Sequence, residues 1–317
     1  MYPKVTIMIP TYNQENFIVD AIESALNQDY PNLEIVISDD HSQDNTSELA
    51  AKYLIDKRIK YFRNDTNIGR VNNYRKTLFD YSMGDWVVNL DGDDYFTDIK
   101  FISRAIDYIK GAENLESNIV AYLANHCDLK KINKKLVIKK IDKHAVIIEG
   151  KQYFINYSKI GSFAHMACIY KREKAITANF YIDDFLATDF LSFVKLVLEG
   201  QIILADYNIG VWRKHKSNAS QSNLFEKYKE NIVVDEILAS YASKSINPKE
   251  INKWLIRAKE KTKDDYVFDI VTNSTGTIQF KYLLLNFKLK LSYFVLFFSI
   301  FKKAILSNAT IQNFNNQ

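Results

Sequence analysis

The feature that most constrains the fold is the alternation of strand-like and helix-like segments over the first hundred residues. Short apolar runs, typical of buried strands, lie at 5–10, 33–38, 59–63 and 86–90. Between them, apolar residues recur with the period of a helix at 17–26, 45–54 and 71–81. Strands that alternate with helices at this spacing predict an α/β fold with a parallel sheet and right-handed crossover connections.

The size of the chain agrees with one large domain, or with a domain of roughly 200 residues and an extension. Of its 317 residues, 47% are hydrophobic and 25% are charged, so the chain can bury a sizeable core. The 20 Tyr and 20 Phe are many for a soluble enzyme and suggest contacts with a sugar, a base or a membrane. The two cysteines, Cys127 and Cys168, exclude a disulfide scaffold and a cysteine-based zinc site, and they favour a reducing, cytoplasmic compartment.

The N-terminal residues and the charge distribution narrow the class further. Residues 1–4 lead directly into the first strand-like run, which predicts that there is no signal peptide. No uncharged apolar stretch reaches the ~18 residues that a membrane span needs. The net charge is +4, but residues 278–317 hold five lysines and no acidic residue, so the rest of the chain is net negative. A basic surface that binds nucleic acid is therefore not expected.

Polar residues follow three of the predicted strands. They are Thr11, Tyr12 and Asn13 after the first strand, Asp39 and Asp40 after the second, and Asp91, Asp93 and Asp94 after the fourth. Ligands of open α/β sheets bind beyond the carboxyl ends of the strands, so these residues are candidates for a site. The alternative is that loops are polar in any protein. The clustered carboxylates argue against that alternative, because like charges repel unless a cation lies among them.

The segment Asp91-Gly92-Asp93-Asp94 is typical of a site for Mg²⁺ or Mn²⁺. These cations prefer oxygen ligands and are commonly held by one or two carboxylates together with substrate phosphates. Gly92 removes side-chain bulk between the carboxylates. The segment therefore predicts a divalent cation that binds a diphosphate and neutralises the charge that grows on it as it leaves.

In its motifs and their order, the chain resembles the family 2 glycosyltransferases, which are nucleotide-sugar transferases of the GT-A type. The resemblance spans about 5–220 and rests on VTIMIPTYNQENFIVDAIESALNQDYPNLEIVISDDHSQDNT at 5–46, NIGRVNNY at 67–74, GDWVVNLDGDD at 84–94, TDFLSFVKLVLEG at 188–200 and WRKHKSNAS at 212–220. It implies a Rossmann-like, mainly parallel sheet flanked by helices. It says little about which sugar is transferred.

The resemblance implies roles for residues that would bind the nucleotide. Those expected at the uracil and ribose are Thr11, Tyr12 and Asp39, with Asn13 and Glu15 on the same edge of the sheet. The stretch between Gly69 and Gly84 is about one residue longer than the usual family pattern. Asn73 and Arg75 are therefore only possible nucleotide contacts.

The resemblance also implies the residues at the diphosphate and the reacting hydroxyl. Asp91 and Asp93 match the metal motif, with Asp93 as the expected direct ligand and Asp91 near the ribose and the metal. His215 matches a basic segment that contacts the diphosphate or the metal, and Arg213 lies beside it. Asp189 matches the catalytic base.

The chemistry of the residues agrees with a carboxylate base, because sugar transfer with inversion needs a group that takes the proton of the acceptor hydroxyl. Asp189 is expected in the first turn of a helix over 188–200 with Thr188 as its N-cap, where the helix dipole favours an ionised carboxylate. A capping carboxylate without catalytic role is the alternative, and Asp183 and Asp184 compete for the base role. The family commonly has Glu where this chain has Thr188, which leaves the supporting role of that side chain open.

The helical pattern beyond Ser222 adds a C-terminal extension. The expected domains are a catalytic domain at 1–220, with a nucleotide-sugar-binding half at 1–94 and an acceptor-binding half at 95–220, and a helical region at 221–317. Most lysines of the tail fall in one stripe of a helical wheel and the remaining surface is apolar, as in a helix that lies on an anionic membrane. The alternative is a helix packed on the protein or against a second subunit.

Together these features predict a metal-dependent, inverting glycosyltransferase that uses Mn²⁺ or Mg²⁺. The expected donor is a nucleotide-sugar, a UDP-sugar above others. The expected acceptor is a glycan hydroxyl of a lipid-linked O-antigen or capsule intermediate at the inner face of the cell membrane, by analogy with similar enzymes. The alternatives are a non-catalytic membrane-bound sugar-binding or scaffold module, a sugar nucleotidyltransferase and a glycosidase.

Overall fold

The computed structural model of the chain describes residues 2–114, 118–124, 129, 132–160, 163–215 and 224–273. The predictions for Cys127 and for the lysine-rich tail at 278–317 fall outside these residues. By internal contacts the chain forms two compact units. The first comprises residues 1–219 and 238–251, and the second comprises 220–237 and the residues from 252 onward. The candidate site residues all belong to the first unit.

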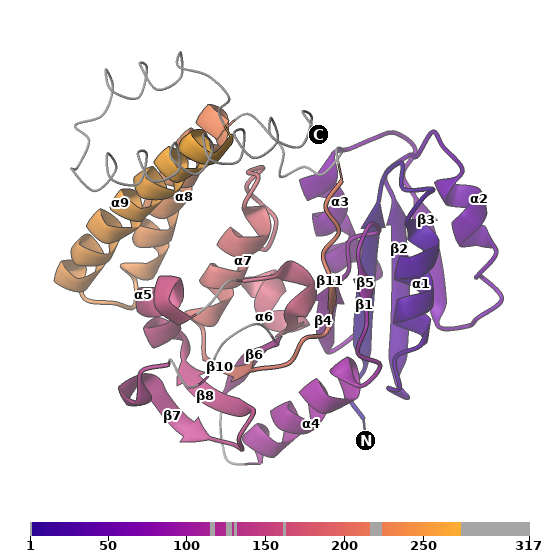
Figure 1. The fold of residues 1–317 in the computed structure, drawn as a ribbon. Helices are drawn as coiled ribbons and strands as arrows, with labels where there is room; N and C mark the ends of the chain where they lie inside the picture. The colour runs from indigo at the N-terminus through magenta and orange to yellow at the C-terminus, as the bar shows by residue number, and fades with distance from the viewer. Residues whose placement is uncertain are drawn as a thin grey trace, which may run out of the picture. The chain divides into compact units, whose positions relative to one another are not determined.

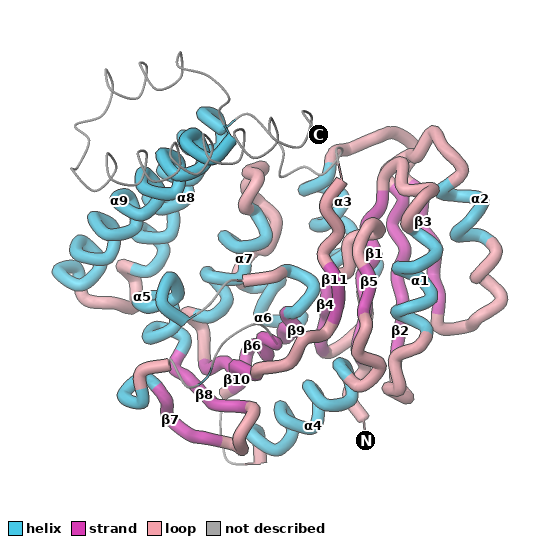
Figure 2. Tube along the Cα trace, in the orientation of Figure 1, coloured by secondary structure: helices cyan, strands magenta, loops and turns pink. Residues whose placement is uncertain are grey.

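The first unit is built on a sheet with the strand order β3-β2-β1-β4-β9-β6-β10-β8-β7 (Figures 1 and 2). Its strands are β1 (Val5–Thr11), β2 (Leu33–Asp39), β3 (Ile59–Arg63), β4 (Trp86–Asn89), β6 (Ile119–Ala124), β7 (Val137–Lys140), β8 (Ala145–Glu149), β9 (Cys168–Lys171) and β10 (Gln201–Ala205). Within this sheet only β8 and β9 run against the direction of the other described strands. The predicted α/β fold with a mainly parallel sheet is confirmed.

The first four strands lie where the sequence predicts them, and their connections set the position of the site. Every residue of β1 and β2 is buried, as expected for central strands of a parallel sheet. The connecting helices are α1 (Ile18–Leu26), α2 (Thr46–Ala51) and α3 (Arg70–Lys76). Because β1, β2 and β4 are parallel, their carboxyl ends lie along one edge of the sheet.

The helix predicted at 71–81 is present, but its last turn has an unusual geometry. After α3 the chain continues as a π-helix over Thr77–Tyr81. A π-helix bonds each residue to one five positions away, so a turn holds more residues than in an α-helix. This turn falls within the stretch between Gly69 and Gly84.

Several local predictions need correction. The helices predicted at 45–54 and 188–200 end earlier, since α2 stops at Ala51 and the later helix at Val197. The sequence at 202–212 is strand-like throughout and predicts one strand, but it forms two strands, β10 and β11 (Gly210–Val211), and β11 pairs with β5 (Tyr95–Phe96) in a separate small sheet. Thr188 is not the N-cap of the following helix, because α7 (Thr188–Val197) is capped by Ala187 while Thr188 Oγ1 donates to the Asp183 carbonyl.

The remaining helices include the C-terminal ones that the sequence predicts. They are α4 (Phe101–Glu113), α5 (Gly150–Ile160), α6 (Arg172–Thr177), α8 (Leu224–Ala242) and α9 (Pro248–Asn273). Within the described ranges, none of the helices has both the length and the apolar character that crossing a membrane requires.

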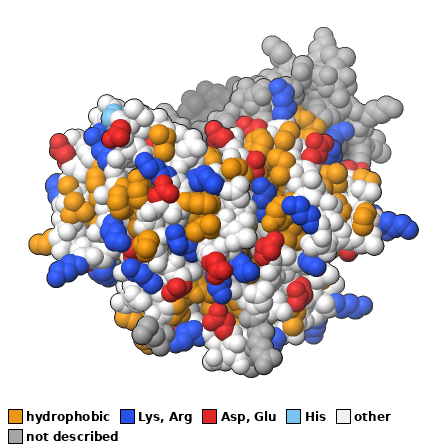
Figure 3. All heavy atoms as spheres, turned by 180° about the vertical axis from the view of Figure 1, so that it is seen from behind, with side chains coloured by type: hydrophobic (Ala, Val, Ile, Leu, Met, Phe, Trp, Pro, Cys, Tyr) orange, Lys and Arg blue, Asp and Glu red, His pale blue; other side chains and the backbone are white. Residues whose placement is uncertain are grey.

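Part of the aromatic content lies in the core of the described residues. Four tyrosines and four phenylalanines are the largest fully buried side chains, namely Tyr122, Tyr153, Tyr170, Tyr181, Phe101, Phe154, Phe180 and Phe193. These eight rings therefore serve packing. On the face seen in Figure 3, acidic and basic side chains are interspersed with hydrophobic ones over the described residues.

Candidate functional site

A short antiparallel pair brings the acidic segment at 91–94 and the basic segment at 212–215 together. β5 directly follows the acidic segment, and β11 directly precedes the basic one. Their antiparallel register makes the chain after β11 run back along residues 91–94. Gly210 permits this approach, because a Cβ at this position would lie 2.6 Å from the Tyr95 carbonyl oxygen.

His215 contacts the predicted metal ligand directly. Its Nε2 lies 2.9 Å from Asp93 Oδ2, and both side chains are largely buried. The His215 ring stacks on Phe17 with the ring centroids 4.7 Å apart. Phe17 precedes α1, so residues from three distant parts of the sequence fix this imidazole beside the carboxylate.

Arg213 is held by the protein on both its backbone and its side chain. Its N–H donates to Asp94 Oδ1 at 3.0 Å. Its guanidinium pairs with Asp20 of α1 and lies 4.5 Å from the centre of the Tyr95 ring. Asp94 therefore anchors the basic segment, a role that the sequence did not indicate.

Asp91 is fixed from α3 and β4. Tyr74 donates its hydroxyl to Asp91 Oδ1 at 2.7 Å, and Asn89 Nδ2 donates to the same oxygen at 2.9 Å. Burial raises the pKa of Tyr74 well above its usual value, and the Asp91 carboxylate raises it further, so Tyr74 stays a hydrogen-bond donor. The second oxygen of Asp91 accepts no hydrogen bond among those found in the described part of the chain.

Gly92 is needed for a second reason besides the one that the sequence suggested. A Cβ on Gly92 would lie 2.1 Å from Gln14 Oε1 and 2.8 Å from Thr11 Oγ1. The segment therefore packs against the end of β1, where Thr11 Oγ1 donates to Gln14 Oε1 at 2.6 Å. Gly92 therefore lets the acidic segment lie against the end of β1, and it also leaves space between the carboxylates.

Burial and mutual repulsion disfavour the ionised forms of Asp93 and Asp94 at this edge. Burial raises the pKa of Asp93, and repulsion from Asp91 raises it further against the hydrogen bond to His215. The same two causes raise the pKa of Asp94 to about 8, against the hydrogen bond from the Arg213 N–H. A positive charge placed among these side chains would favour their ionised forms.

The donor set suits a hard divalent cation that has further ligands from a substrate. Asp91 and Asp93 offer carboxylate oxygens, and His215 offers an imidazole nitrogen. Among the described residues, however, no group of three or more His, Cys, Asp or Glu side chains is arranged as a complete metal site. The residues thus fit a cation whose coordination a bound diphosphate would complete.

The residues expected at the nucleoside lie on the same edge but differ in how they are held. Thr11 is buried, and Tyr12 is 44% exposed. Asn13 has a positive φ of 52° and accepts the Gln43 N–H on its Oδ1 at 2.7 Å. Glu15 Oε2 accepts both the backbone and the side-chain N–H groups of Asn45. Asn13 and Glu15 therefore order the loop after β2.

Asp39 is fully buried and is already hydrogen-bonded within the protein. Its Oδ1 accepts the Ser42 N–H at 2.8 Å, and its Oδ2 accepts the Tyr61 hydroxyl at 2.7 Å. Arg63 Nε lies 3.7 Å from the same Oδ2. Sequence reasoning missed Tyr61 and Arg63, because β3 shows no polar cluster that would single them out.

Asn73 and Arg75, the possible nucleotide contacts, are used inside the protein. Asn73 is buried, and it donates to the Ser38 carbonyl and accepts the Ser38 hydroxyl. Arg75 donates to the Phe180 carbonyl at 2.7 Å and lies 4.0 Å from the Phe79 ring centre. These contacts support packing between α3 and its neighbours.

Asp189 lies in the first turn of α7 and is partly exposed. Of its two competitors, Asp183 is paired with Lys195 at 2.8 Å, and Asp184 is exposed. Arg70 connects this region to the metal motif. Burial disfavours its charge, but Tyr74 and the carboxylates of Asp91 and Asp189 raise the pKa of Arg70 overall.

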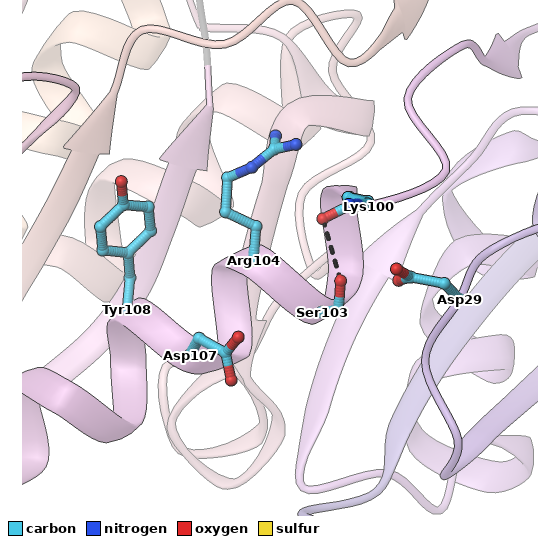
Figure 4. A pocket seen from close by; sticks show the side chains of 6 residues that line it. All are labelled: Asp29, Lys100, Ser103, Arg104, Asp107 and Tyr108. Atoms are coloured by element: carbon cyan, nitrogen blue, oxygen red, sulfur yellow. Dashed lines mark hydrogen bonds between the residues drawn. The ribbon is translucent and has the colours of Figure 1, made fainter.

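A separate pocket of about 640 Å³ lies on the solvent side of α4 (Figure 4). It is lined by Asp29, Lys100, Ser103, Arg104, Asp107 and Tyr108. Asp29 precedes β2, so this pocket lies toward the amino ends of the parallel strands, away from the residues described above. None of the predicted site residues lines it.

Comparisons with known proteins agree with the sequence and the fold. Residues 6–176 match the family described as Glycosyl transferase family 2. The GalNAc(5)-diNAcBac-PP-undecaprenol β-1,3-glucosyltransferase of Campylobacter jejuni is 38% identical over 93 residues, which are 29% of this chain and 30% of that protein. The chain spans 60% or less of the length of the most similar curated relatives.

Two solved structures share the fold. Staphylococcus aureus TarS 1–349 in complex with UDP-GlcNAc has a TM-score of 0.64 at 18% identity, over 87% of this chain and 77% of that one. The mannosyltransferase PcManGT of Pyrobaculum calidifontis with GDP-Man and Mn²⁺ has a TM-score of 0.54 at 17% identity, over 99% of this chain and 87% of that one. With the family match covering more than half of the sequence, the chain belongs to glycosyl transferase family 2 and has the GT-A fold.

Proposed function

We propose that the chain transfers a sugar from a nucleotide-sugar donor, a UDP-sugar, to a hydroxyl group of a glycan with inversion at the sugar carbon. One observation carries the proposal: the contact of His215 with Asp93, which unites the acidic and basic segments at the carboxyl edge of the sheet. The family and the shared fold with a UDP-GlcNAc complex of TarS support the donor class.

Asp91 and Asp93, with His215 beside them, would hold a Mn²⁺ or Mg²⁺ ion. The ion would neutralise negative charge on the diphosphate when it is bound. The fit rests on the crowding of the carboxylates, which together with burial raises the pKa values of Asp93 and Asp94, and PcManGT, which shares the fold, is known with Mn²⁺.

The chain's own residues would bind and orient the two substrates. Thr11, Tyr12, Asn13, Glu15 and Asp39 would form the nucleoside edge. Asn13 and Glu15 would act by ordering the loop at 42–45, and Asp39 through its contact with Tyr61. Arg213 would contribute positive charge near the diphosphate while Asp94 holds its backbone.

Asp189 would take the proton of the acceptor hydroxyl on Oδ1 or Oδ2. Its place in the first turn of α7 favours a negative charge there. Asp183 is a poorer candidate, because Lys195 already occupies its Oδ2. The proposed acceptor is a lipid-linked glycan. The Campylobacter relative supports this class, because its name describes an undecaprenol-linked glycan as the acceptor.

The proposed organisation follows the sequence expectations. Residues 1–220 would form the catalytic domain with donor and acceptor halves at 1–94 and 95–220, and 221–317 a helical region that associates with the inner membrane face. Deletion after residue 277 should release the protein from vesicles of anionic lipid. Binding that persists would contradict the membrane part of the proposal.

Donor hydrolysis tests the activity itself. A panel of UDP-, GDP- and dTDP-sugars is incubated with the protein in Mn²⁺ and in EDTA, and the released nucleotide is measured. We expect release from a UDP-sugar only with the cation. A lack of turnover with every donor would instead favour a non-catalytic sugar-binding or scaffold role.

A further inference from the structure

Arg70 connects the N-terminal, nucleotide-binding half of the sheet to the loop before α7, the helix that carries Asp189. One guanidinium nitrogen, Nη2, donates to the carbonyls of Phe185 and Leu186 at 3.0 and 3.1 Å. Arg70 is the first residue of α3, whereas these carbonyls lie 115 and 116 positions further along the chain. The contact thus connects two regions that the sequence separates widely.

The local backbone directs Arg70 toward this loop. Gly69 has a φ of +88°, a conformation that side chains with a Cβ rarely adopt. The buried Asp40 fixes it, because its carboxylate accepts the N–H groups of Ile68 and Gly69 at 2.9 Å each. Asp40 itself follows β2, so the carboxyl edge of the sheet determines where α3, and with it Arg70, begins.

The loop before α7 makes other hydrogen bonds, and two of them go to α7 itself. Asp183 pairs with Lys195 of α7, and its carbonyl accepts the Thr188 hydroxyl. Both partners belong to the helix that the loop precedes, so these contacts move with α7. Arg70 instead attaches residues 185–186 to α3.

Arg70 also lies next to the residues that fix the metal motif. Its guanidinium carbon is 5.5 Å from the centre of the Tyr74 ring, and the Tyr74 hydroxyl donates to Asp91. The Arg70 guanidinium therefore lies near the residues that hold Asp91, and it also holds the loop before Asp189. A planar guanidinium suits this place, because its donors can serve two acceptors in fixed directions without losing charge.

We propose that Arg70 is a positioning residue for sugar transfer: it holds the turn at 185–186 so that the Asp189 carboxylate faces the acceptor hydroxyl while the donor is bound. This inference rests on the proposed function, in which Asp189 is the base. Arg70 would act on the transfer step through Asp189 and contribute little to donor affinity.

The test separates donor binding from transfer in Arg70→Ala and Arg70→Lys. Arg172→Ala is the matched control, because Arg172 also donates to two carbonyls, those of Leu78 and Phe79, but at the opposite edge of the sheet. We expect Arg70→Ala to lower kcat about 10–100-fold, as misplacement of a catalytic group does. UDP affinity in Mn²⁺ should change less than about twofold, and Arg70→Lys should recover part of the rate.

A double-mutant cycle with Asp189→Asn gives a result that a purely structural role would not produce. If Arg70 acts through Asp189, the double variant should transfer no more slowly than Asp189→Asn alone. The inference would be overturned if the losses in kcat of the two single variants multiplied in the double variant. It would also be overturned if Arg70→Ala lost no more activity than Arg172→Ala, or if it bound UDP more weakly. If Arg70→Ala does not fold, Arg70→Lys and Arg70→Gln enter the same cycle.

The outcome for the base is read separately. Normal transfer by Asp189→Asn would refute the proposed base and the role of Arg70 with it. A slow Asp189→Asn variant with an independent Arg70 effect would refute only the inference on Arg70.

Discussion

Asp94 should make the stability of the metal-free protein depend on pH in a defined way. Its side chain is 3% exposed, Asp91 and Asp93 are close to it, and its Oδ1 accepts the Arg213 N–H. Burial and the neighbouring charge raise its pKa from the ordinary 3.8 to about 8. Asp94→Asn keeps an oxygen for the Arg213 N–H but removes the ionisation, so it isolates the charge.

The sign follows from the direction of the shift. Because the folded-state pKa lies above that of the unfolded chain, the folded state is favoured while the carboxyl is protonated. That contribution is complete below about pH 3.8 and is lost as pH rises to about 8. One pKa unit corresponds to about 1.4 kcal/mol, so the loss between about pH 5 and about pH 8 is about 4 kcal/mol.

Urea unfolding in EDTA at several pH values between about 5 and 8 measures this effect. The free energy of unfolding of wild type relative to Asp94→Asn should fall steadily by about 4 kcal/mol over that range. Asp29→Asn, at the other edge of the sheet, controls for the loss of one negative charge. A difference between wild type and Asp94→Asn that stays constant with pH would refute the reasoning.

Three further substitutions test the site. Asp93→Ala should lower Mn²⁺-dependent UDP affinity at least about tenfold by calorimetry; unchanged affinity would refute the metal assignment. Asp189→Ala should keep UDP affinity but lower transfer about 10²–10⁴-fold, whereas normal transfer would move the base elsewhere. Gly92→Ala would place a Cβ 2.1 Å from Gln14 Oε1 and 2.8 Å from Thr11 Oγ1. It should destabilise the protein by about 1–3 kcal/mol in urea unfolding, and an unaltered midpoint would contradict that packing.

The order of the first strands could be predicted because each is a continuous apolar run with a helix before the next. Such runs are buried on both faces, and the period of the intervening segments leaves little choice of topology. The polar residues at the strand ends then fall on one edge by geometry alone. Asp91 and Asp93 were expected on this edge for that reason, whereas His215 was expected near them only through the family resemblance. The structure brings Asp93 and His215 into contact.

Local pattern did not predict features that depend on tertiary approach. The segment at 206–209 has apolar neighbours, but it leaves the large sheet so that β11 can pair with β5. Thr188 has the chemistry of a cap, yet its hydroxyl is used by the Asp183 carbonyl. In the first case the pairing with a strand far away in the sequence determines the conformation, and in the second a carbonyl five residues upstream takes up the hydroxyl.

The site residues that sequence reasoning missed act through partners far away in the chain. Tyr61 reaches Asp39 from β3, and Tyr74 reaches Asp91 from α3. Arg70 stands in the segment NIGRVNNY that carries part of the family resemblance, but nothing in that segment indicates the carbonyls it holds. Among the residues that support the site from outside it, the sequence indicated only Asp40, because it is the second acidic residue after β2.

A crystal structure with UDP and Mn²⁺ tests the central claim most directly. We expect an anomalous manganese peak within bonding distance of a carboxylate oxygen of Asp93 and next to His215, with the diphosphate bound to the same ion. A nucleotide bound elsewhere, or a manganese peak remote from residues 91–94, would contradict it.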